Sequence, residues 1–216
     1  MNNQNISCIV PAFRWGDKNN NTLKSEYQQF FPDSFTLETP RVLLRLVKPE
    51  DYDPFLALAK EKEIWQYFSK DLSDENELKK WMDKLFRERA QEIRMPFTVI
   101  DKHTYEICGS ASFVSISFYN KCIEIGSVWM GKSFMGTGIM RETGFVLLSY
   151  AFEVMRMERV ELRVDNLNER AKSAFLKIGM IPEGVLRSNA VVQGNRRRDT
   201  LYFSILRSEW QERKEN

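Results

Sequence analysis

The sequence predicts a mixed α/β fold of the α+β type, in which a glycine-bearing loop joins a central strand to a long helix. Short apolar segments that suit strands alternate with longer segments in which apolar residues recur at helical spacing. The loop, residues 131–138, contains Gly131, Gly136 and Gly138. The strands before it follow one another through short turns, which favours antiparallel pairing.

Size and composition limit the class of protein. On a prior of about 150 residues per domain, a chain of 216 residues makes one domain, or one domain with an appendage. Hydrophobic residues make up 43% and charged residues 29%, which excludes wholesale disorder and fibrous repeats. Lys and Arg total 32 against 30 Asp and Glu, so no basic excess suggests direct nucleic-acid binding.

Cysteine usage and hydropathy favour a cytoplasmic protein. Cys8, Cys108 and Cys122 are odd in number and form no C-x-x-C pair, so neither a disulfide framework nor a metal cluster is expected. The most apolar stretch, residues 144–155, contains Glu153 and is shorter than the about 18 apolar residues that a membrane span needs. The first residues lack the basic start of a signal peptide.

The first 35 residues differ from the rest of the chain. They are rich in Asn, Gln and Ser, and they hold no helical or strand period for long. We expect an N-terminal extension over residues 1–35. It is either a disordered tail or partly ordered where its aromatic residues dock on the domain. Those residues are Phe13, Trp15, Tyr27, Phe30 and Phe31. The main domain is expected over residues 36–210, and a C-terminal tail over 211–216.

Elements before the glycine loop follow from periodicity and helix-start signals. Pro49, Glu50 and Asp51 suit the first turn of a helix that runs to about residue 60. A second helix begins at residues 73–75, with Leu78, Trp81, Met82 and Leu85 on one face. Strands are predicted over residues 41–47, 97–100, 106–119 and 124–130, with a turn at 101–105.

Elements after the loop complete the fold. A helix is expected up to about Met155, with Met140, Leu147, Leu148, Ala151 and Met155 on its apolar face. Residues 160–164 alternate as a strand, and residues 171–178 form a helix that Gly179 ends. Strands over 184–192 and 200–206 are joined by residues 193–198.

The glycine loop carries a chemical signal. Glycines between a strand and a helix let a ligand approach the backbone, and the helix N-terminus offers free N–H groups to a pyrophosphate. A structural tight turn is the alternative interpretation. The segment lacks the Gly-Lys-Ser/Thr of a P-loop and the third glycine of a dinucleotide fingerprint.

Further motifs follow in order along the chain. They comprise residues 37–45 (Leu-Glu-Thr-Pro-Arg-Val-Leu-Leu-Arg), 124–126 (Glu-Ile-Gly), 168–180 (beginning Asn-Glu-Arg-Ala), 183–187, Gly194, Arg198-Asp199 and 203–206. With the glycine loop, this set resembles the GNAT family of acetyl-CoA-dependent N-acetyltransferases. Within the family it resembles the RimJ/RimL-type branch of ribosomal-protein-alanine N-acetyltransferases. The resemblance covers about residues 35–210.

The resemblance implies a mixed, mostly antiparallel sheet, flanked by helices, that splays into a V between two central strands. Acetyl-CoA would enter that gap as cosubstrate, with its pyrophosphate on the loop and its pantetheine along the strand edge. The implied cofactor-binding residues are Val128, Trp129, Met130, Ser133, Met135, Gly136, Thr137, Gly138, Ile139, Met140, Asn168, Ala171 and Phe175. For Asn168, a helix N-cap is an alternative role that is compatible with the first.

The chain departs from the family pattern where a general acid is usual. Ser133 stands where Gln or Arg is frequent, and it keeps a hydrogen-bond donor. Phe175 replaces a tyrosine that protonates the leaving thiolate in many members, and Ala171 a serine with that role in some. Ala190 occupies a position where a glutamate base is possible. A thiol of pKa about 8.5 is a fair leaving group without an acid.

Glu124 is the candidate general base, because it lies on the strand that enters the gap. A solvated or salt-bridged carboxylate is the alternative. Deprotonating a lysine amine requires about 4.6 kcal/mol at pH 7, whereas an α-amine requires about 1–1.4 kcal/mol. A site with weak acid–base groups therefore favours a protein N-terminus or a small amine as acceptor, acetylated by direct transfer in a ternary complex.

Two other functions stay open: a non-catalytic acyl-CoA-binding module on the same fold, and a protein that binds ATP or NAD through the glycine loop.

Several residues have plainer interpretations. His103 is expected at the surface, and residues 196–198 form either a solvated turn or a contact to an acidic substrate or phosphate. Five aromatic residues either line an acceptor pocket or belong to the core: Trp65, Tyr67, Phe68, Trp81 and Phe97. Three acidic residues either attract a cationic acceptor or lie on a solvated face: Glu61, Glu63 and Asp71. Monomer and homodimer are both compatible with the sequence.

Overall fold

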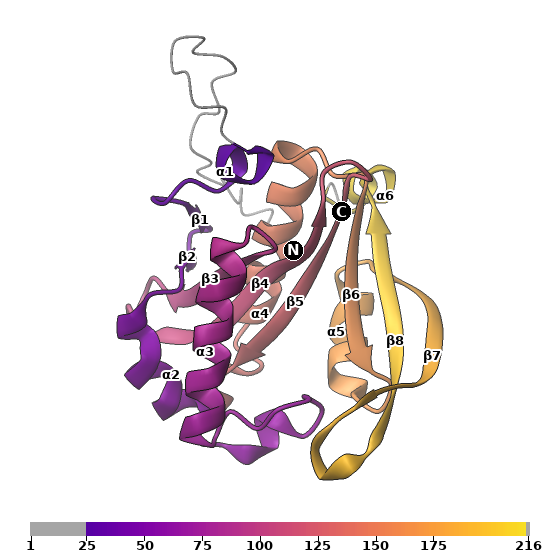
Figure 1. Cartoon of the computed structure of the whole chain (residues 1–216). Coiled ribbons are helices and arrows are strands. Elements are labelled where there is room, and N and C mark those ends of the chain that lie inside the picture. Colours follow the sequence, from indigo (N-terminus) through magenta and orange to yellow (C-terminus); the bar gives the residue numbers. More distant parts are fainter. Residues whose placement is uncertain (1–24, 215–216) are drawn as a thin grey trace.

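The computed structural model describes residues 25–214, and Cys8, Phe13 and Trp15 lie outside this range. Its centre is one eight-stranded sheet with the order β1-β2-β3-β4-β5-β6-β8-β7 (Figure 1). Every neighbouring pair is antiparallel except β5 and β6. The predicted mixed, mostly antiparallel sheet is confirmed. The strands are β1 (Thr36–Glu38), β2 (Val42–Leu46), β3 (Arg94–Asp101), β4 (Ile107–Ser117), β5 (Cys122–Met130), β6 (Arg159–Asp165), β7 (Ile181–Val191) and β8 (Arg197–Leu206).

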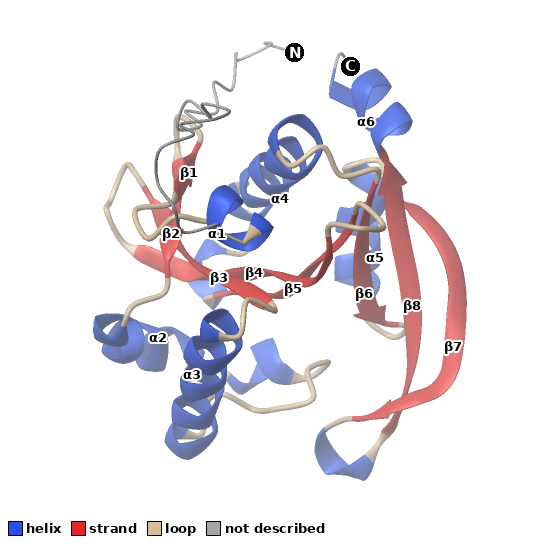
Figure 2. Ribbon diagram, turned by 45° about the horizontal axis from the view of Figure 1, so that its top comes forward, coloured by secondary structure: helices blue, strands red, loops and turns tan. Residues whose placement is uncertain are grey.

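Helices cover both faces of the sheet. In Figure 2, α1 and α4 lie on one side of β3–β5, and α2 and α3 lie on the other. The helices are α1 (Glu26–Phe30), α2 (Tyr52–Ala59), α3 (Glu75–Ala90), α4 (Ile139–Ser149), α5 (Glu169–Lys177) and α6 (Arg207–Lys214). Residues of α1, α4 and α6 contribute to one buried cluster, the main core, against which α5 packs, and residues of α2 and α3 contribute to another, the second core.

The helix predicted to reach Met155 changes its geometry before that residue. The α-helix ends at Ser149, and Tyr150–Val154 form a π-helical turn in which the Met155 N–H donates to the Tyr150 carbonyl at 3.0 Å. The extra residue per turn keeps Tyr150, Ala151 and Phe152 buried. Met140 was wrongly placed on the apolar face, because its side chain is 38% exposed.

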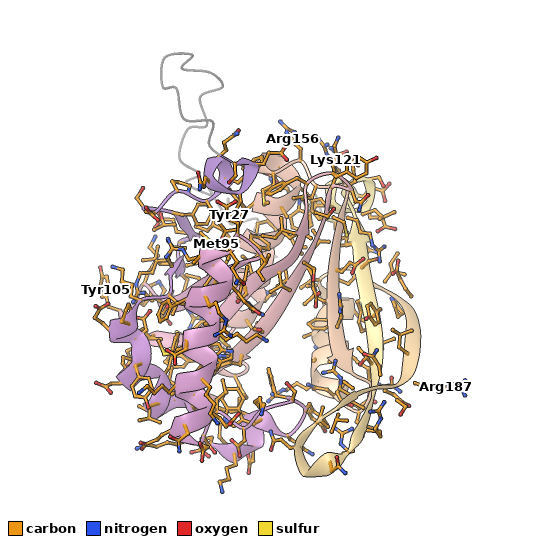
Figure 3. The ribbon with its side chains drawn as sticks, viewed as in Figure 1. Tyr27, Met95, Tyr105, Lys121, Arg156 and Arg187 are labelled. Carbon is orange, nitrogen blue, oxygen red and sulfur yellow. The ribbon has the colours of Figure 1, made fainter. Side chains whose placement is uncertain are left out.

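The segment before β1 packs on the sheet. Tyr27, Phe31 and Phe35 are buried in the main core. The Tyr27 hydroxyl donates to the Arg94 carbonyl at 2.5 Å, and Figure 3 shows Tyr27 beside Met95 of β3. The ring of Phe30 stacks on Phe118 at 5.6 Å. These contacts tie residues 25–35 to β3 and β4.

Residues 25–214 contain neither a membrane-spanning helix nor a cluster of metal-ligating side chains. None of their helices combines the length and the apolar character that crossing a membrane requires. In the same range, His, Cys, Asp and Glu side chains form no group of three arranged to hold a metal ion.

Candidate active site

The sheet splits between β5 and β6. These two strands pair in parallel at only three positions, and Glu124, opposite Glu161, is the last of them. Beyond it, residues 125–130 of β5 and 162–165 of β6 diverge (Figure 1). The register of β4 and β5 shifts between Ser110 and Ser112, and Ser127 has a φ of 51°. Within residues 25–214, the β6-facing edge of β5 beyond Glu124 has no strand partner. A bulge of this kind favours a local bend of the strand.

The glycine loop follows β5 and leads into α4. Gly136 and Gly138 have φ values of 78° and 94°, a region that favours glycine. A Cβ atom on Gly136 would meet nothing within 4 Å, so open space lies beside its backbone. The Thr137 hydroxyl donates to the Phe134 carbonyl at 2.7 Å, and Arg41 donates to the Thr137 carbonyl at 2.6 Å. The loop is therefore held from within and from β2.

The N-terminus of α4 suits an anion. Its cap is Gly138, which has no side chain to bond the first amides, and the first helical bond runs from Glu142 to the Gly138 carbonyl. The amides of Ile139, Met140 and Arg141 precede that bond, as the free donors of a helix start do. Ser133, in the turn that precedes the glycines, is exposed. These residues fit a pyrophosphate.

A second helix begins close to this loop. Asn168 is the N-cap of α5, and its side-chain oxygen accepts from the Ala171 amide at 3.1 Å. Arg170 of the first turn contacts the Met135 sulfur at 2.8 Å. Phe175, further along α5, packs against Phe203 at 5.4 Å between ring centroids. Its ring carries no proton for a leaving group.

Glu124 lies where the two strands part. The residue is 9% exposed, its carboxylate forms an ion pair with Arg163 at 2.8 Å, and it accepts a hydrogen bond from the Ser115 hydroxyl at 3.1 Å. A bulge in β4, where Ser115 has a φ of 51°, brings the serine to this place. Burial raises the pKa of Glu124, although the Arg163 charge and the Ser115 hydrogen bond oppose the rise. A carboxylate of raised pKa accepts a proton more readily near neutral pH.

The three residues at the end of β5 face the gap through their backbone. Trp129 is buried in the second core, at 5.0 Å from the Trp65 ring and 5.4 Å from Phe55. Met130 is buried in the main core, and Val128 packs on it. Free N–H and C=O groups of an unpaired edge are suited to a ligand that carries amides.

Several candidates for the acceptor pocket have structural roles instead. Phe97 and Trp65 are completely buried, so neither lines an open pocket. Tyr67, Phe68 and Trp81 are half-buried. Carboxylates in this region have local partners: Glu61 and Glu63 pair with Lys132, and Asp71 accepts from the Ser73 amide. His103 is exposed in a turn, as expected.

Sequence reasoning missed the residues that surround Glu124. Arg163 lies over the ring of Tyr202 at 5.0 Å while it bonds Glu124. Across the open end of the gap, the Gln193 side chain donates to the Trp65 carbonyl at 2.8 Å and so joins the β7–β8 loop to the segment after α2. The alternation of residues 160–164 was visible in the sequence, but the parallel register that places Arg163 beside Glu124 was not.

A sheet split beside a glycine loop fits an acyl-CoA-dependent transferase. The family model "Acetyltransferase (GNAT) domain" matches residues 41–181. The chain therefore belongs to the GNAT acetyltransferase family. It is an N-acetyltransferase that uses acetyl-CoA.

Relatives agree with this assignment. The "Putative ribosomal N-acetyltransferase YdaF" of Bacillus subtilis (strain 168) is 33% identical over 105 residues, which cover 49% of this chain and 56% of that protein. The "Uncharacterized N-acetyltransferase p20" of Bacillus licheniformis is 28% identical over 81% of this chain and 98% of its own.

Solved structures share the fold. A GCN5-related N-acetyltransferase from Brucella melitensis has a TM-score of 0.77 and 28% identity, over 85% of this chain and 84% of that one. The ribosomal-protein-S5-alanine acetyltransferase from Vibrio fischeri has a TM-score of 0.66 and 19% identity, over 82% of this chain and 98% of that one. At that identity the second match shows the fold alone.

Proposed function

We propose that this enzyme transfers the acetyl group of acetyl-CoA to a primary amine, with the α-amine of a peptide N-terminus as acceptor, by direct transfer in a ternary complex. The observation that carries the proposal is the divergence of β5 and β6 directly after Glu124. Around this divergence lie the unpaired edge of β5, a buried carboxylate and a loop whose amides are free to bind phosphate. The printed name of the Bacillus subtilis relative, a ribosomal N-acetyltransferase, supports a protein acceptor.

Each part of the gap has a proposed role toward acetyl-CoA. The backbone of residues 135–140 binds the pyrophosphate, with Ser133 as an additional donor and the glycines leaving room. The backbone of residues 128–130 pairs with the pantetheine amides. Asn168, Ala171 and Phe175 of the α5 segment border the cofactor on the β6 side. The acetyl group then lies near Glu124, where the two strands meet.

The chemistry follows from these positions. The neutral amine attacks the thioester carbonyl, so that a carbon–nitrogen bond forms and the carbon–sulfur bond breaks. The amine proton passes to Glu124, directly or through one water, and CoA leaves as a thiolate that solvent protonates. Backbone N–H groups of β5 stabilise the negative charge on the carbonyl oxygen. An α-amine suits this site because it is deprotonated at lower pH than a lysine amine.

We also propose a division of the chain. The acetyltransferase domain spans residues 36–210, preceded by an extension over 1–35 and followed by a tail over 211–216. Trp210 at the end of the domain is buried against Phe145 and Phe152. The extension contributes Tyr27 and Phe31 to the main core.

The test begins with calorimetric titration of acetyl-CoA, with ATP and NAD as controls, followed by an acetylation screen of peptides and small amines. The expected result is saturable binding of acetyl-CoA alone and acetylation of peptide N-termini. Binding without transfer to any amine would instead identify a non-catalytic acyl-CoA-binding module. Binding of ATP without acetyl-CoA would contradict the proposal altogether.

A further inference from the structure

Charged residues of both signs lie on one face of β6 and β8. On these strands, Val160, Leu162, Val164, Leu201, Phe203 and Ile205 belong to the main core. Side chains alternate along a strand, so the residues between them lie on the opposite face, here called the front face. The front face carries Glu161, Arg163, Asp165, Arg198, Thr200, Tyr202 and Ser204.

Most charges around the front face are paired. Arg163 bonds Glu124, Arg196 bonds Asp165, and Arg159 bonds both Glu161 and Glu183. These contacts leave little free charge near the point where β5 and β6 part.

Arg198 is the exception. Its Nε donates to the Thr200 hydroxyl at 3.0 Å, but within residues 25–214 no carboxylate lies within 4.0 Å of its guanidinium. The two terminal nitrogens, which form the fork that binds carboxylates, have no hydrogen-bond partner among the described residues. The side chain is half-buried, and burial lowers the pKa of Arg198, while Asp165 opposes this and Arg196 and Arg163 add to it. A desolvated cation among other cations is stabilised by an anion.

The position of Arg198 indicates that the anion belongs to the acceptor and not to the pyrophosphate of the cofactor. The glycine loop leads into α4, which packs on the main-core face of the sheet, whereas Arg198 is on the front face. Arg198 is also the second residue of β8, which follows the loop whose Gln193 is bonded to Trp65. The anion would therefore lie on the acceptor side of the gap, away from the pyrophosphate.

The strand register gives the distance between Glu124 and Arg198. Glu124 is opposite Glu161, and Glu161 is opposite Ser204. Arg198 precedes Ser204 by six positions on β8, which is about 20 Å of extended strand. After allowance for the Arg198 side chain, an extended peptide spans this distance with about four residues.

We propose that Arg198 binds a carboxylate of the acceptor, so that the enzyme prefers peptide N-termini with an acidic side chain within about the first four residues. The inference rests on the proposed function, because it specifies the acceptor of the same site. Arg198 positions the peptide and takes no part in bond making.

The experiment compares three peptides of one length and one N-terminal residue, which carry glutamate, glutamine or lysine at positions two to four. Wild-type protein is assayed at saturating acetyl-CoA beside Arg198→Ala, Arg198→Lys and the control Arg187→Ala. Arg187 is exposed on the outer side of β7, away from the gap (Figure 3). Binding of the same peptides to the CoA-loaded protein is measured by calorimetry, so that one readout does not depend on turnover.

Wild-type enzyme should favour the glutamate peptide over the glutamine peptide by about tenfold or more in kcat/KM, the size of a charge-assisted hydrogen bond. Arg198→Ala should abolish this preference through KM with kcat unchanged, Arg198→Lys should keep part of it, and Arg187→Ala should keep all. An equal preference in Arg198→Ala would overturn the inference, as would weaker acetyl-CoA binding in that variant with peptide binding unchanged.

Failure of the proposed function gives a different pattern. If no peptide is acetylated, Arg198-dependent binding of the glutamate peptide still supports the carboxylate site. If peptides are acetylated without regard to their charge, the proposed function holds and the carboxylate site is wrong.

Discussion

Glu124 is held between two opposing influences. Burial disfavours its charge, and the guanidinium of Arg163 at 2.8 Å favours it. Its net pKa is raised, so the carboxylate gains a proton at a higher pH than an ordinary glutamate does. Such a carboxylate is a better base at neutral pH. It is also protonated, and therefore inactive as a base, at a higher pH than an ordinary glutamate.

Glu124→Gln should lower kcat by about 10²–10⁴-fold, since proton transfer by a positioned side chain contributes that much. In the wild type, kcat should fall as the pH decreases through the raised pKa of Glu124, because the protonated carboxyl cannot accept the amine proton. The variant should lack this limb in a pH–rate profile. Glu161→Gln, beside it on β6, is the matched control and should keep the limb. A limb of equal midpoint in Glu124→Gln would remove this residue from the mechanism.

Only part of this residue-level arrangement could be predicted from the sequence. The position of Glu124 on the strand before the glycine loop follows from local periodicity. Its partners Ser115 and Arg163 do not, because one depends on a bulge in β4 and the other on the register of two parallel strands that are distant in sequence.

At the scale of elements, the loop between β5 and α4 combines a left-handed backbone conformation, which glycine adopts without strain, with open space. Gly136 has a φ of 78° and no neighbour within 4 Å of a built Cβ atom. Gly194, between β7 and β8, has a φ of 66° and the same open surroundings. The two glycines therefore differ in location and not in conformation, which makes them a matched pair.

Alanine at either glycine should lower the free energy of unfolding by about 1–2 kcal/mol, because an L-residue is strained in the left-handed region. Only Gly136→Ala should also weaken acetyl-CoA binding, because its methyl group occupies space beside the loop amides. Chemical denaturation and calorimetry measure the two effects separately. Equal loss of acetyl-CoA affinity in Gly194→Ala would show that strain, and not the site, is responsible.

The strands and helices themselves were largely predictable, because amphipathic periodicity and the Pro49 and Gly179 signals are local. The π-helical turn at Tyr150–Val154 was not predicted, and no local signal in these residues marks it. Burial of Trp65 and Phe97 depends on tertiary packing, which an aromatic residue in a sequence does not disclose.

For the molecule as a whole, Asp51 connects three parts of the fold. Its buried carboxylate accepts from Arg45 at 2.6 Å, from Thr98 of β3 at 2.6 Å and from the Lys48 amide at 2.9 Å. Burial alone would raise the pKa of Asp51, but the hydrogen bonds from Arg45, Thr98 and Lys48 lower it. The resulting stability is present above the unfolded-state pKa of about 3.9 and is lost as the pH falls through the lower, folded-state value.

Asp51→Asn should reduce the free energy of unfolding by about 3 kcal/mol at pH 7, because it leaves Arg45 without its partner. The variant should also lose less stability than the wild type between pH 4 and more acidic conditions. Denaturation midpoints measured across this range test both effects. The exposed Asp53 gives the control Asp53→Asn, which should change little. An acid profile unchanged from wild type in Asp51→Asn would contradict this role.

The global shape was predicted through family resemblance rather than through physics of the single sequence. A mostly antiparallel sheet with one short parallel seam depends on long-range pairing, and no local pattern encodes that β5 and β6 pair at only three positions.

The aromatic second core gives the protein an intrinsic optical probe. Trp129 has its backbone on the open edge of β5 and its ring 5.0 Å from Trp65 and 6.1 Å from Trp81. Buried indoles so close together exchange excitation energy, and their emission responds to small changes in spacing and polarity. A ligand that pairs with the edge of β5 pulls directly on this group. Occupancy of the gap is therefore open to measurement by tryptophan fluorescence on unlabelled protein.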